Sequence, residues 1–261
     1  MESDTSKMAT DDAEAPVKDA YLKNADYWIR IVRERLDPYQ QQITDPALLA
    51  AIGDPSGLEC LDAGCGEGHF ARQLVERGAR HIYGVDNSQP FVAAAVAHEA
   101  ADQRTSTFYH SDVARLPLAD GCVDLVYANR LPHALACPER RFHEFARVLR
   151  SNGRLIQLSL HPCFYVARSE RDQSSRQSIN ARDYFAGRTI TQHFDVDGVS
   201  PAASVQRFYS LEEHVRLITE AGFVITDIAE PRPHDLLQEG TFWADTFRFP
   251  MFLLITARLE R

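Results

Sequence analysis

The stretch LDAGCGEGHF, residues 61–70, is the part of this 261-residue chain that determines which fold the sequence predicts. It places glycines at alternate positions, Gly64, Gly66 and Gly68, between an apolar run and a stretch with helical spacing. A glycine turn between a strand and a helix lies at the carboxyl edge of a parallel sheet, where doubly wound folds bind ligands. The stretch therefore predicts a ligand held against bare backbone. A tight turn without a ligand is the alternative.

On both sides of this turn, segments with strand character alternate with segments of helical spacing. Gly78 closes one expected helix and Ser88 caps another. Such alternation implies a parallel sheet with both faces covered. The five expected strands are residues 57–64, 81–86, 106–112, 122–129 and 153–160, and two further β-rich segments follow at 223–231 and 250–259.

Length and pattern indicate one domain behind an acidic tail. The tail holds six acids against two lysines and is expected to be disordered. The segment after Leu160 is polar and lacks regular periodicity, so it is expected to form a cap over the ligand edge. The predicted parts are a tail (1–19) and a domain (20–261), itself divided into N-terminal helices (20–56), a cofactor-binding core (57–160), a cap insertion (161–209) and a C-terminal helix with two strands (210–261).

The net charge and the cysteines restrict which macromolecules and metal ions this protein is expected to bind. The net charge is −9, and no stripe of lysine and arginine appears, which disfavours a nucleic acid or an anionic membrane as partner. The five cysteines form no CxxC pair and no metal-ligand spacing, so reduced thiols and no metal site are expected. No apolar stretch approaches a membrane span. We therefore expect a cytoplasmic protein with a small-molecule ligand. The sequence leaves a homodimer open.

Two further strand ends carry acids. Asp86 ends the second expected strand, 24 positions after Asp62, where a carboxylate can accept the hydroxyls of a ribose. Asp112 ends the third, where it can accept from an exocyclic amino group, and Val113 can lie against an adenine ring. Backbone, ribose acceptor and adenine acceptor at three strand ends predict a nucleoside ligand.

The spacing of the glycine turn narrows the kind of nucleoside. A dinucleotide site requires G-x-G-x-x-G, and here His69 stands where the third glycine belongs. Asp62 before the turn would repel a phosphate and favour an ammonium group. A P-loop is excluded because no Gly-Lys-Ser/Thr follows. The sequence thus favours adenosine with a cationic amino-acid tail, and it disfavours a nicotinamide-dependent oxidoreductase.

The segments LDAGCGEG, VDNS, SDVARLPLADGCVDLVYAN and RVLRSNGRLI resemble, in order and spacing, the successive motifs of class I S-adenosylmethionine-dependent methyltransferases, over roughly residues 58–160. The resemblance implies an α/β fold with a doubly wound, seven-stranded, mostly parallel sheet, the Rossmann-like methyltransferase fold, whose seventh strand is antiparallel. The nearest likeness is to small-molecule enzymes that modify ubiquinone precursors or secondary metabolites. The NPPY-like tetrapeptide of nucleic-acid amino methyltransferases is absent.

The same resemblance assigns cofactor contacts. The backbone of Asn129, which closes the fourth strand, would lie near the methionine amino group. The remaining contacts would be Asp62, Ala63, Gly64, Cys65 and Gly66 for the methionine moiety, Asp86 and Asn87 for the ribose, and Asp112 and Val113 for the adenine.

The acceptor site is less defined. In-line methyl transfer needs mainly alignment and exclusion of water, and a base only for acceptors with a high pKa. His133 and His161 follow the fourth and fifth strands and are candidate bases, with a structural role as the alternative. Tyr21 and Tyr27 are candidate lid residues over the cofactor and acceptor, whereas Trp28 is expected in the core. Arg207 is a candidate partner for a carboxylate of the acceptor.

These observations favour O- or N-methylation of a small organic acceptor. A non-enzymatic regulatory or scaffold protein that binds S-adenosylmethionine remains an alternative, as does other S-adenosylmethionine chemistry on the same fold. The identity of the acceptor does not follow from the sequence.

Overall fold

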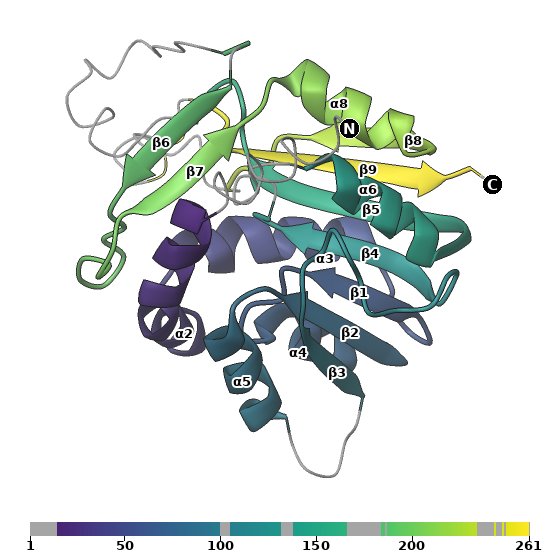
Figure 1. The fold of residues 1–261 in the computed structure, drawn as a ribbon, viewed down its shortest axis with the longest axis horizontal. Coiled ribbons are helices and arrows are strands. Elements are labelled where there is room, and N and C mark those ends of the chain that lie inside the picture. Colours follow the sequence, from purple (N-terminus) through teal and green to yellow (C-terminus); the bar gives the residue numbers. More distant parts are fainter. Residues whose placement is uncertain are drawn as a thin grey trace, which may run out of the picture.

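The computed structural model describes residues 15–99, 105–131, 138–165, 184–185, 187–233, 243, 247 and 249–260. Its centre is a seven-stranded sheet in the order β3-β2-β1-β4-β5-β9-β8 (Figure 1). All neighbours pair in parallel except β9, which is antiparallel to both β5 and β8. This confirms the expected fold class. The strands are β1 Glu59–Ala63, β2 His81–Asp86, β3 Ser106–His110, β4 Val123–Asn129, β5 Leu149–Leu160, β8 Phe223–Ala229 and β9 Phe252–Leu259.

Helices cover both faces of the sheet, and successive residues of each strand alternate between the two cores. Tyr127 of β4 belongs to the core under α3 (Asp45–Ile52) and α4 (His69–Glu76). Its neighbour Val126 belongs to the core under α6 (Glu139–Val148) and α8 (Leu211–Glu220). Helix α5 (Gln89–His98) packs on β2 and β3. The carboxyl ends of the parallel strands thus meet at one edge between the two helical layers.

The N-terminal region is helical further upstream than expected. Residues 15–23 are helical, followed by α2 (Ala25–Arg33) and a π-helical segment, η1 (Gln40–Thr44), which runs directly into α3. The predicted boundary of a disordered tail at residue 19 is therefore wrong, because Val17 and Ala20 are buried and anchor this helix. Residues 1–14 of the predicted tail lie outside the described part.

The predicted cap contains regular structure that the sequence analysis did not anticipate. Strands β6 (Arg188–Gln192) and β7 (Ser204–Phe208) pair as an antiparallel two-stranded sheet beside α2 (Figure 1). Its buried face alternates apolar and polar side chains, such as Ile190 next to Gln192, and hydrophobicity alone therefore shows no period of two. Much of the remaining cap, residues 166–183, lies outside the described residues.

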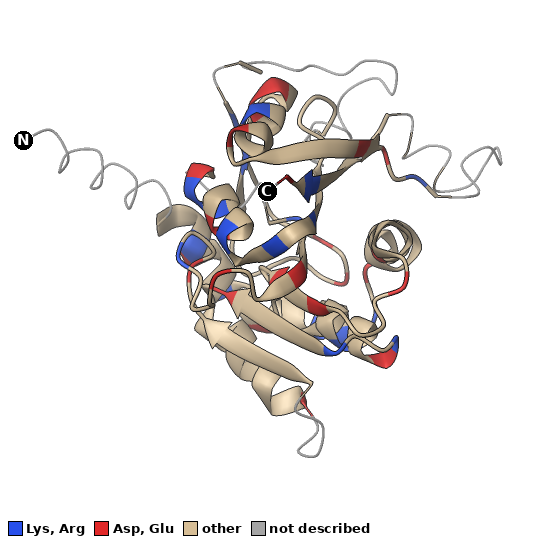
Figure 2. Cartoon of the chain, turned by 90° about the vertical axis from the view of Figure 1, so that its right-hand side faces the viewer, with Lys and Arg blue, Asp and Glu red and all other residues tan. Residues whose placement is uncertain are grey.

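Charged residues of both signs are interspersed on the described helices (Figure 2). Arg147 pairs with Glu144 and Asp120, and Arg216 pairs with Glu213 and Glu220. In the part of the chain that the structure describes, no helix is both long and apolar enough to span a bilayer, and no three His, Cys, Asp or Glu side chains cluster as metal ligands would.

Candidate functional site

The glycine turn is held on the end of β2. Gly64 N and Cys65 N both donate to the carbonyl of Val85, at 2.8 and 3.1 Å. Gly64, Gly66 and Gly68 all have positive φ, between 54° and 80°, a region that side chains disfavour. A Cβ at Gly66 would also meet no atom within 4 Å, so space is open above this backbone. The positive φ values explain why these three positions are glycine. The open space next to Gly66 leaves room for a ligand against the backbone.

Asp86 at the end of β2 is tied to this turn. Its Oδ2 accepts from Gly66 N at 3.0 Å and its Oδ1 from Ser88 N at 2.8 Å. Burial raises the pKa of this carboxyl, and the two backbone donors oppose the shift. Each carboxylate oxygen keeps further acceptor capacity beyond these bonds, so the residue can position the turn and still accept hydroxyl groups.

Asp62, Tyr127 and Asn129 form a buried acceptor group at the carboxyl ends of β1 and β4. Asp62 pairs in register with Tyr127, and Asn129 lies two residues further on the same face. Within the described residues, Asp62 Oδ2, Tyr127 Oη and Asn129 Oδ1 are buried and make no hydrogen bond of normal geometry. Burial raises the pKa of Asp62 to about 7, although the nearby Tyr127 phenol, a weakly placed donor to this carboxyl, opposes the rise. Two buried acceptors without donors are what an ammonium group would satisfy.

The predicted adenine contacts lie after β3. Val113 is buried, whereas Asp112 is exposed and its Oδ1 accepts from Ala114 N at 2.8 Å. The carbonyl of Asn87, after β2, contacts His110 Nε2 at 3.1 Å. The structure thus brings the expected cofactor residues of β1, β2, β3 and β4 to one edge of the sheet.

Comparison with known proteins agrees with this arrangement. Residues 61–157 match the family model described as a methyltransferase domain. The chain is 37% identical over 113 residues to the malonyl-[acyl-carrier protein] O-methyltransferase of Pectobacterium atrosepticum, which covers 43% of each chain. The similarity to a methyltransferase domain thus covers residues 61–157, the part of the chain that holds most of β1, all of β2 to β4 and most of β5.

Solved structures of methyltransferases are similar over most of the chain. An S-adenosylmethionine-dependent methyltransferase from Mesorhizobium loti has a TM-score of 0.65 at 25% identity and covers 82% of this chain and 96% of its own. The 1,6-didemethyltoxoflavin-N1-methyltransferase of Burkholderia thailandensis, solved with bound S-adenosylhomocysteine, has a TM-score of 0.56 at 18% identity and covers 94% and 91%. The chain spans between 39% and 62% of the length of the first three curated relatives.

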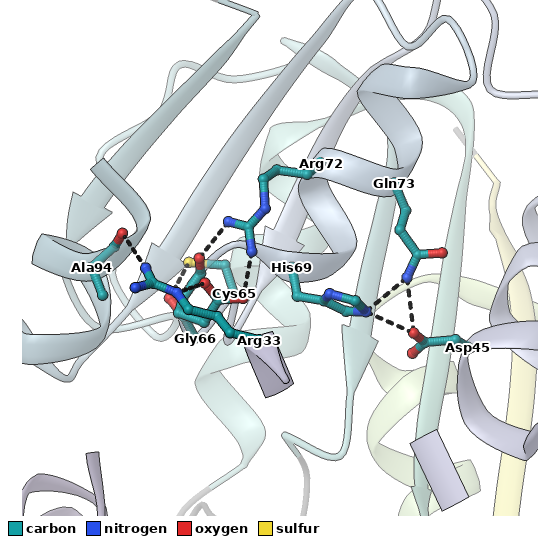
Figure 3. Close-up of polar contacts among 9 residues, drawn as sticks. Arg33, Asp45, Cys65, Gly66, His69, Arg72, Gln73 and Ala94 are labelled. Carbon is teal, nitrogen blue, oxygen red and sulfur yellow. Dashed lines mark hydrogen bonds and ion pairs between the residues drawn. The ribbon is translucent and has the colours of Figure 1, made fainter. Parts of the chain in front are cut away.

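Hydrogen bonds and ion pairs that the sequence did not predict connect Arg33 of α2 to Glu67 in the glycine turn (Figure 3); we call this contact the Arg33–Glu67 strap. Arg33 of α2 donates from Nε to Glu67 Oε2 at 3.0 Å and from Nη2 to the carbonyl of Ala94 at 2.9 Å. Arg72 of α4 pairs with the other Glu67 oxygen. Glu67 is buried inside the glycine turn, and an acid at that position was the one available signal.

Figure 3 also shows that Asp45 and Gln73 hold His69, the residue that departs from the dinucleotide pattern. Asp45 Oδ2 lies 2.9 Å from His69 Nε2 and accepts from Gln73 Nε2 at 2.8 Å. This network links the start of α3 to α4, so His69 has a structural role in the domain.

Tyr21 interacts electrostatically with two residues at strand ends, Arg130 and Asp86. Burial raises the pKa of Tyr21 to about 12, the Arg130 cation opposes this, and the Asp86 carboxylate adds to it. Arg130 has a left-handed φ of 62° directly after β4, and its Nη1 lies 3.3 Å from the buried Asp37 carboxylate. Tyr21 therefore lies within electrostatic reach of Asp86. Arg130 was not predicted, because nothing in its local pattern marks it.

Tyr27 and Trp28 differ from expectation. Tyr27 is buried, and its hydroxyl accepts from Val196 N at 3.0 Å. Trp28 is half-buried, and its ring centre lies 5.0 Å from that of Phe194. The prediction that Trp28 is the core residue is wrong, because the β6–β7 connection packs over this helix and covers Tyr27. The Tyr27 hydroxyl is occupied in holding that connection.

The remaining acceptor-site predictions are His161, Arg207 and His133. His161 is buried, with Nδ1 accepting from Cys163 N at 3.2 Å and Nε2 lying 3.2 Å from Glu230 Oε1. Both ring nitrogens are therefore engaged. Arg207 lies on the less buried face of β7, opposite Thr189. His133 lies outside the described residues.

Proposed function

We propose that this protein transfers a methyl group from S-adenosylmethionine to an oxygen or nitrogen atom of a small organic acceptor. The observation that carries the proposal is a pair of buried acceptors, Asp62 Oδ2 and Asn129 Oδ1, that make no hydrogen bond of normal geometry with any described residue and lie at the strand ends beside an open glycine turn. An adenosine with a cationic amino-acid tail supplies the missing donors. The names of the O- and N-methyltransferases to which the chain is similar support both kinds of acceptor atom.

The cofactor would be held by residues at four strand ends. Asp62 and Asn129 would accept from the amino group, Asp86 would accept from the ribose hydroxyls, and Val113 with Asp112 would face the adenine. When bound, S-adenosylmethionine supplies an electrophilic methyl group on a sulfonium centre. The contribution of the chain is to orient the acceptor against this group and to exclude water, effects worth up to about 7–11 kcal/mol.

The strap from Arg33 to Glu67 serves this purpose by fixing α2 over the glycine turn. The two engaged nitrogens of His161 favour acceptors that need no strong base. A carboxylate or a neutral amine is such an acceptor, whereas an alcohol is not.

The test is methyl transfer from S-adenosylmethionine with a methyl label into small-molecule acceptors, followed by mass spectrometry of the products. Asp86→Ala should lower S-adenosylhomocysteine affinity at least about tenfold, because each lost charge-assisted hydrogen bond is worth about 1.5–3 kcal/mol. Asp227→Ala on the exposed face of β8 is the matched control and should bind normally.

Asp86 also holds Gly66 N and Ser88 N, so Asp86→Asn, which keeps one acceptor oxygen, should be measured in parallel with circular dichroism of both variants. Unchanged affinity in a folded Asp86→Ala protein would remove the ribose assignment. Absence of any labelled product across carboxylate, phenol and amine acceptors, together with normal cofactor binding, would contradict the proposed transfer.

A further inference from the structure

A second group of buried polar side chains lies on the opposite face of the sheet from Asp62. Arg141 of α6 and Gln157 of β5 are each 1% exposed, Ser159 of β5 is 2% exposed, and His214 of α8 is 4% exposed. Gln157 and Ser159 alternate with Ile156 and Leu158, which belong to the core on the Tyr127 side. The group therefore lies under α6 and α8, separate from the proposed cofactor contacts.

These side chains converge at the ligand-binding edge. Arg141 lies in the first turn of α6 and His214 in the first turn of α8. Helix α6 follows parallel strand β4, and α8 precedes β8, which runs in the same direction as β5. Both helices thus begin at the edge where β5 ends. This is the edge at which doubly wound folds bind ligands.

The hydrogen-bonding capacity of the group is largely unused. Arg141 Nη2 lies 3.5 Å from Gln157 Oε1, and the guanidinium carbon lies 4.5 Å from the centre of the Phe142 ring. Among the residues that the structure describes, no hydrogen-bond partner is present for Arg141 Nε, Arg141 Nη1, Gln157 Nε2, Ser159 Oγ and His214 Nδ1. Most of these atoms are donors, and native proteins rarely leave such donors buried and unpaired.

The charge of the group is also unbalanced. Among the described residues, no carboxylate forms an ion pair with Arg141. The Tyr209 phenol and the exposed Glu139 carboxylate act on its pKa only electrostatically. Burial lowers the pKa of Arg141 to about 9, so the guanidinium remains a cation at neutral pH. Burial and the nearby Arg141 lower the pKa of His214 to about 3, so His214 is neutral. His161 is engaged with Glu230. One buried positive charge therefore lacks a counter-ion within the described part of the chain.

We propose that Arg141, together with Gln157, Ser159 and His214, binds a carboxylate group of the methyl acceptor. A single carboxylate matches the single positive charge and accepts from several of the unpaired donors, whereas a phosphate dianion would exceed the charge available. That this carboxylate belongs to the methyl acceptor rests on the proposed methyltransferase function. Binding of a carboxylate to the site can be measured without turnover.

The experiment uses acetate as the probe and follows the thermal unfolding of the full chain at constant ionic strength, with chloride and phosphate as comparison anions. Acetate should raise the melting temperature of the wild type progressively with concentration, because it binds the folded state. Chloride and phosphate should not. Arg141→Met should lose the acetate shift, and Arg140→Met, an exposed neighbour on the same helix, should retain it.

Gln157→Glu provides a second variant if Arg141→Met fails to fold. It places a carboxylate beside Arg141, so it should melt above the wild type without acetate and respond to acetate no further. Equal acetate shifts in the wild type and Arg141→Met would overturn the proposal. A phosphate shift larger than the acetate shift, and dependent on Arg141, would overturn the choice of carboxylate.

S-adenosylhomocysteine binding separates this proposal from the proposed function. Both variants should bind it as the wild type does, because the cofactor contacts lie on the other face of the sheet. A wild type that responds to acetate but not to S-adenosylhomocysteine would remove the methyltransferase function and leave the carboxylate site. The reverse result would remove the carboxylate site alone.

Discussion

Asp62 combines burial, a high pKa and a missing donor in one side chain. It is 3% exposed, and its neighbours Asp86 and Asp45 add to the rise of its pKa to about 7. In the protein without ligand, the folded state therefore holds the Asp62 proton over a range in which the unfolded state has lost it. An ammonium group near Asp62 would reverse this preference, because an opposite charge favours the ionised form.

This gives a prediction for pH dependence. S-adenosylhomocysteine affinity of the wild type should increase as pH rises from about 6 to about 8, because the ionised Asp62 is the form that pairs with the amino group. Asp62→Asn should bind more weakly, with a flat profile over this range. Calorimetry across the range measures both. Asp227→Asn, exposed on β8, is the control, and an equal slope in Asp62→Asn would contradict the assignment.

The stability of the unliganded protein depends on pH in the opposite direction from the ligand affinity. Without ligand, Asp62 makes the folded state less stable as pH rises from its ordinary pKa of 3.8 to about 7, since the folded state binds the extra proton in that window. Asp62→Asn should therefore be more stable than the wild type above about pH 7, and the difference should fade toward pH 4. Denaturant unfolding at several pH values checks this.

At the scale of elements, the β6–β7 sheet depends on the N-terminal helices. Asn24, fully buried between residues 15–23 and α2, donates from Nδ2 to the carbonyl of Ala202 at 2.9 Å and accepts from Ala202 N at 2.8 Å. Arg30 of α2 pairs with Asp197 in the connection between the two strands. The two-stranded sheet is therefore placed by contacts to α2 and to Asn24 before it, and Figure 1 shows α2 beside this sheet.

We expect Asn24→Ala to lower the free energy of unfolding by about 1–3 kcal/mol, because it leaves the Ala202 N–H without its acceptor and removes one of the two donors to the Ala202 carbonyl, the other being Ser200 Oγ. Amide hydrogen exchange should speed up most in β6 and β7, with little change in the seven-stranded sheet. Lys23→Ala is the matched control, since its ion pair with Asp19 is exposed and worth little. Uniform acceleration across the chain would instead indicate general destabilisation.

At the scale of the molecule, the two helical layers separate two chemical environments along one edge of the sheet. Within the described ranges, buried oxygen acceptors on the side of α3 and α4 lack donors. On the side of α6 and α8, buried nitrogen donors lack acceptors from any described residue. A cationic group suits the first environment and an anionic group suits the second. The sheet edge between them is where the two proposed ligands would meet.

Cofactor selectivity is the corresponding prediction for the whole protein. S-adenosylhomocysteine should raise the melting temperature in proportion to its excess over the dissociation constant, and NAD should not, because Asp62 and the glycine spacing disfavour a pyrophosphate. Differential scanning fluorimetry compares the two ligands directly. A larger shift with NAD would contradict the proposed methyltransferase function.

Several features of this protein followed from local sequence. The glycine turn, the order of strands and helices, and the acids at strand ends are set by backbone conformation and short-range periodicity. The capping of α8 by Ser210, which accepts from Glu213 N at 3.1 Å, was predictable for the same reason. The antiparallel last strand was expected from the resemblance to a known fold.

Other features required the tertiary structure. In the sequence, Arg140 and Arg141 are two adjacent arginines on an amphipathic helix. Only the packing of α6 against β5 and α8 shows that Arg141 is the buried one. Arg33 meets Glu67, and Asn24 meets Ala202, across long separations in sequence. The polar face of the β6–β7 sheet shows no hydrophobic period. Local pattern reports the backbone conformation of a segment, whereas the burial and pairing of polar side chains depend on which distant segments the fold brings together.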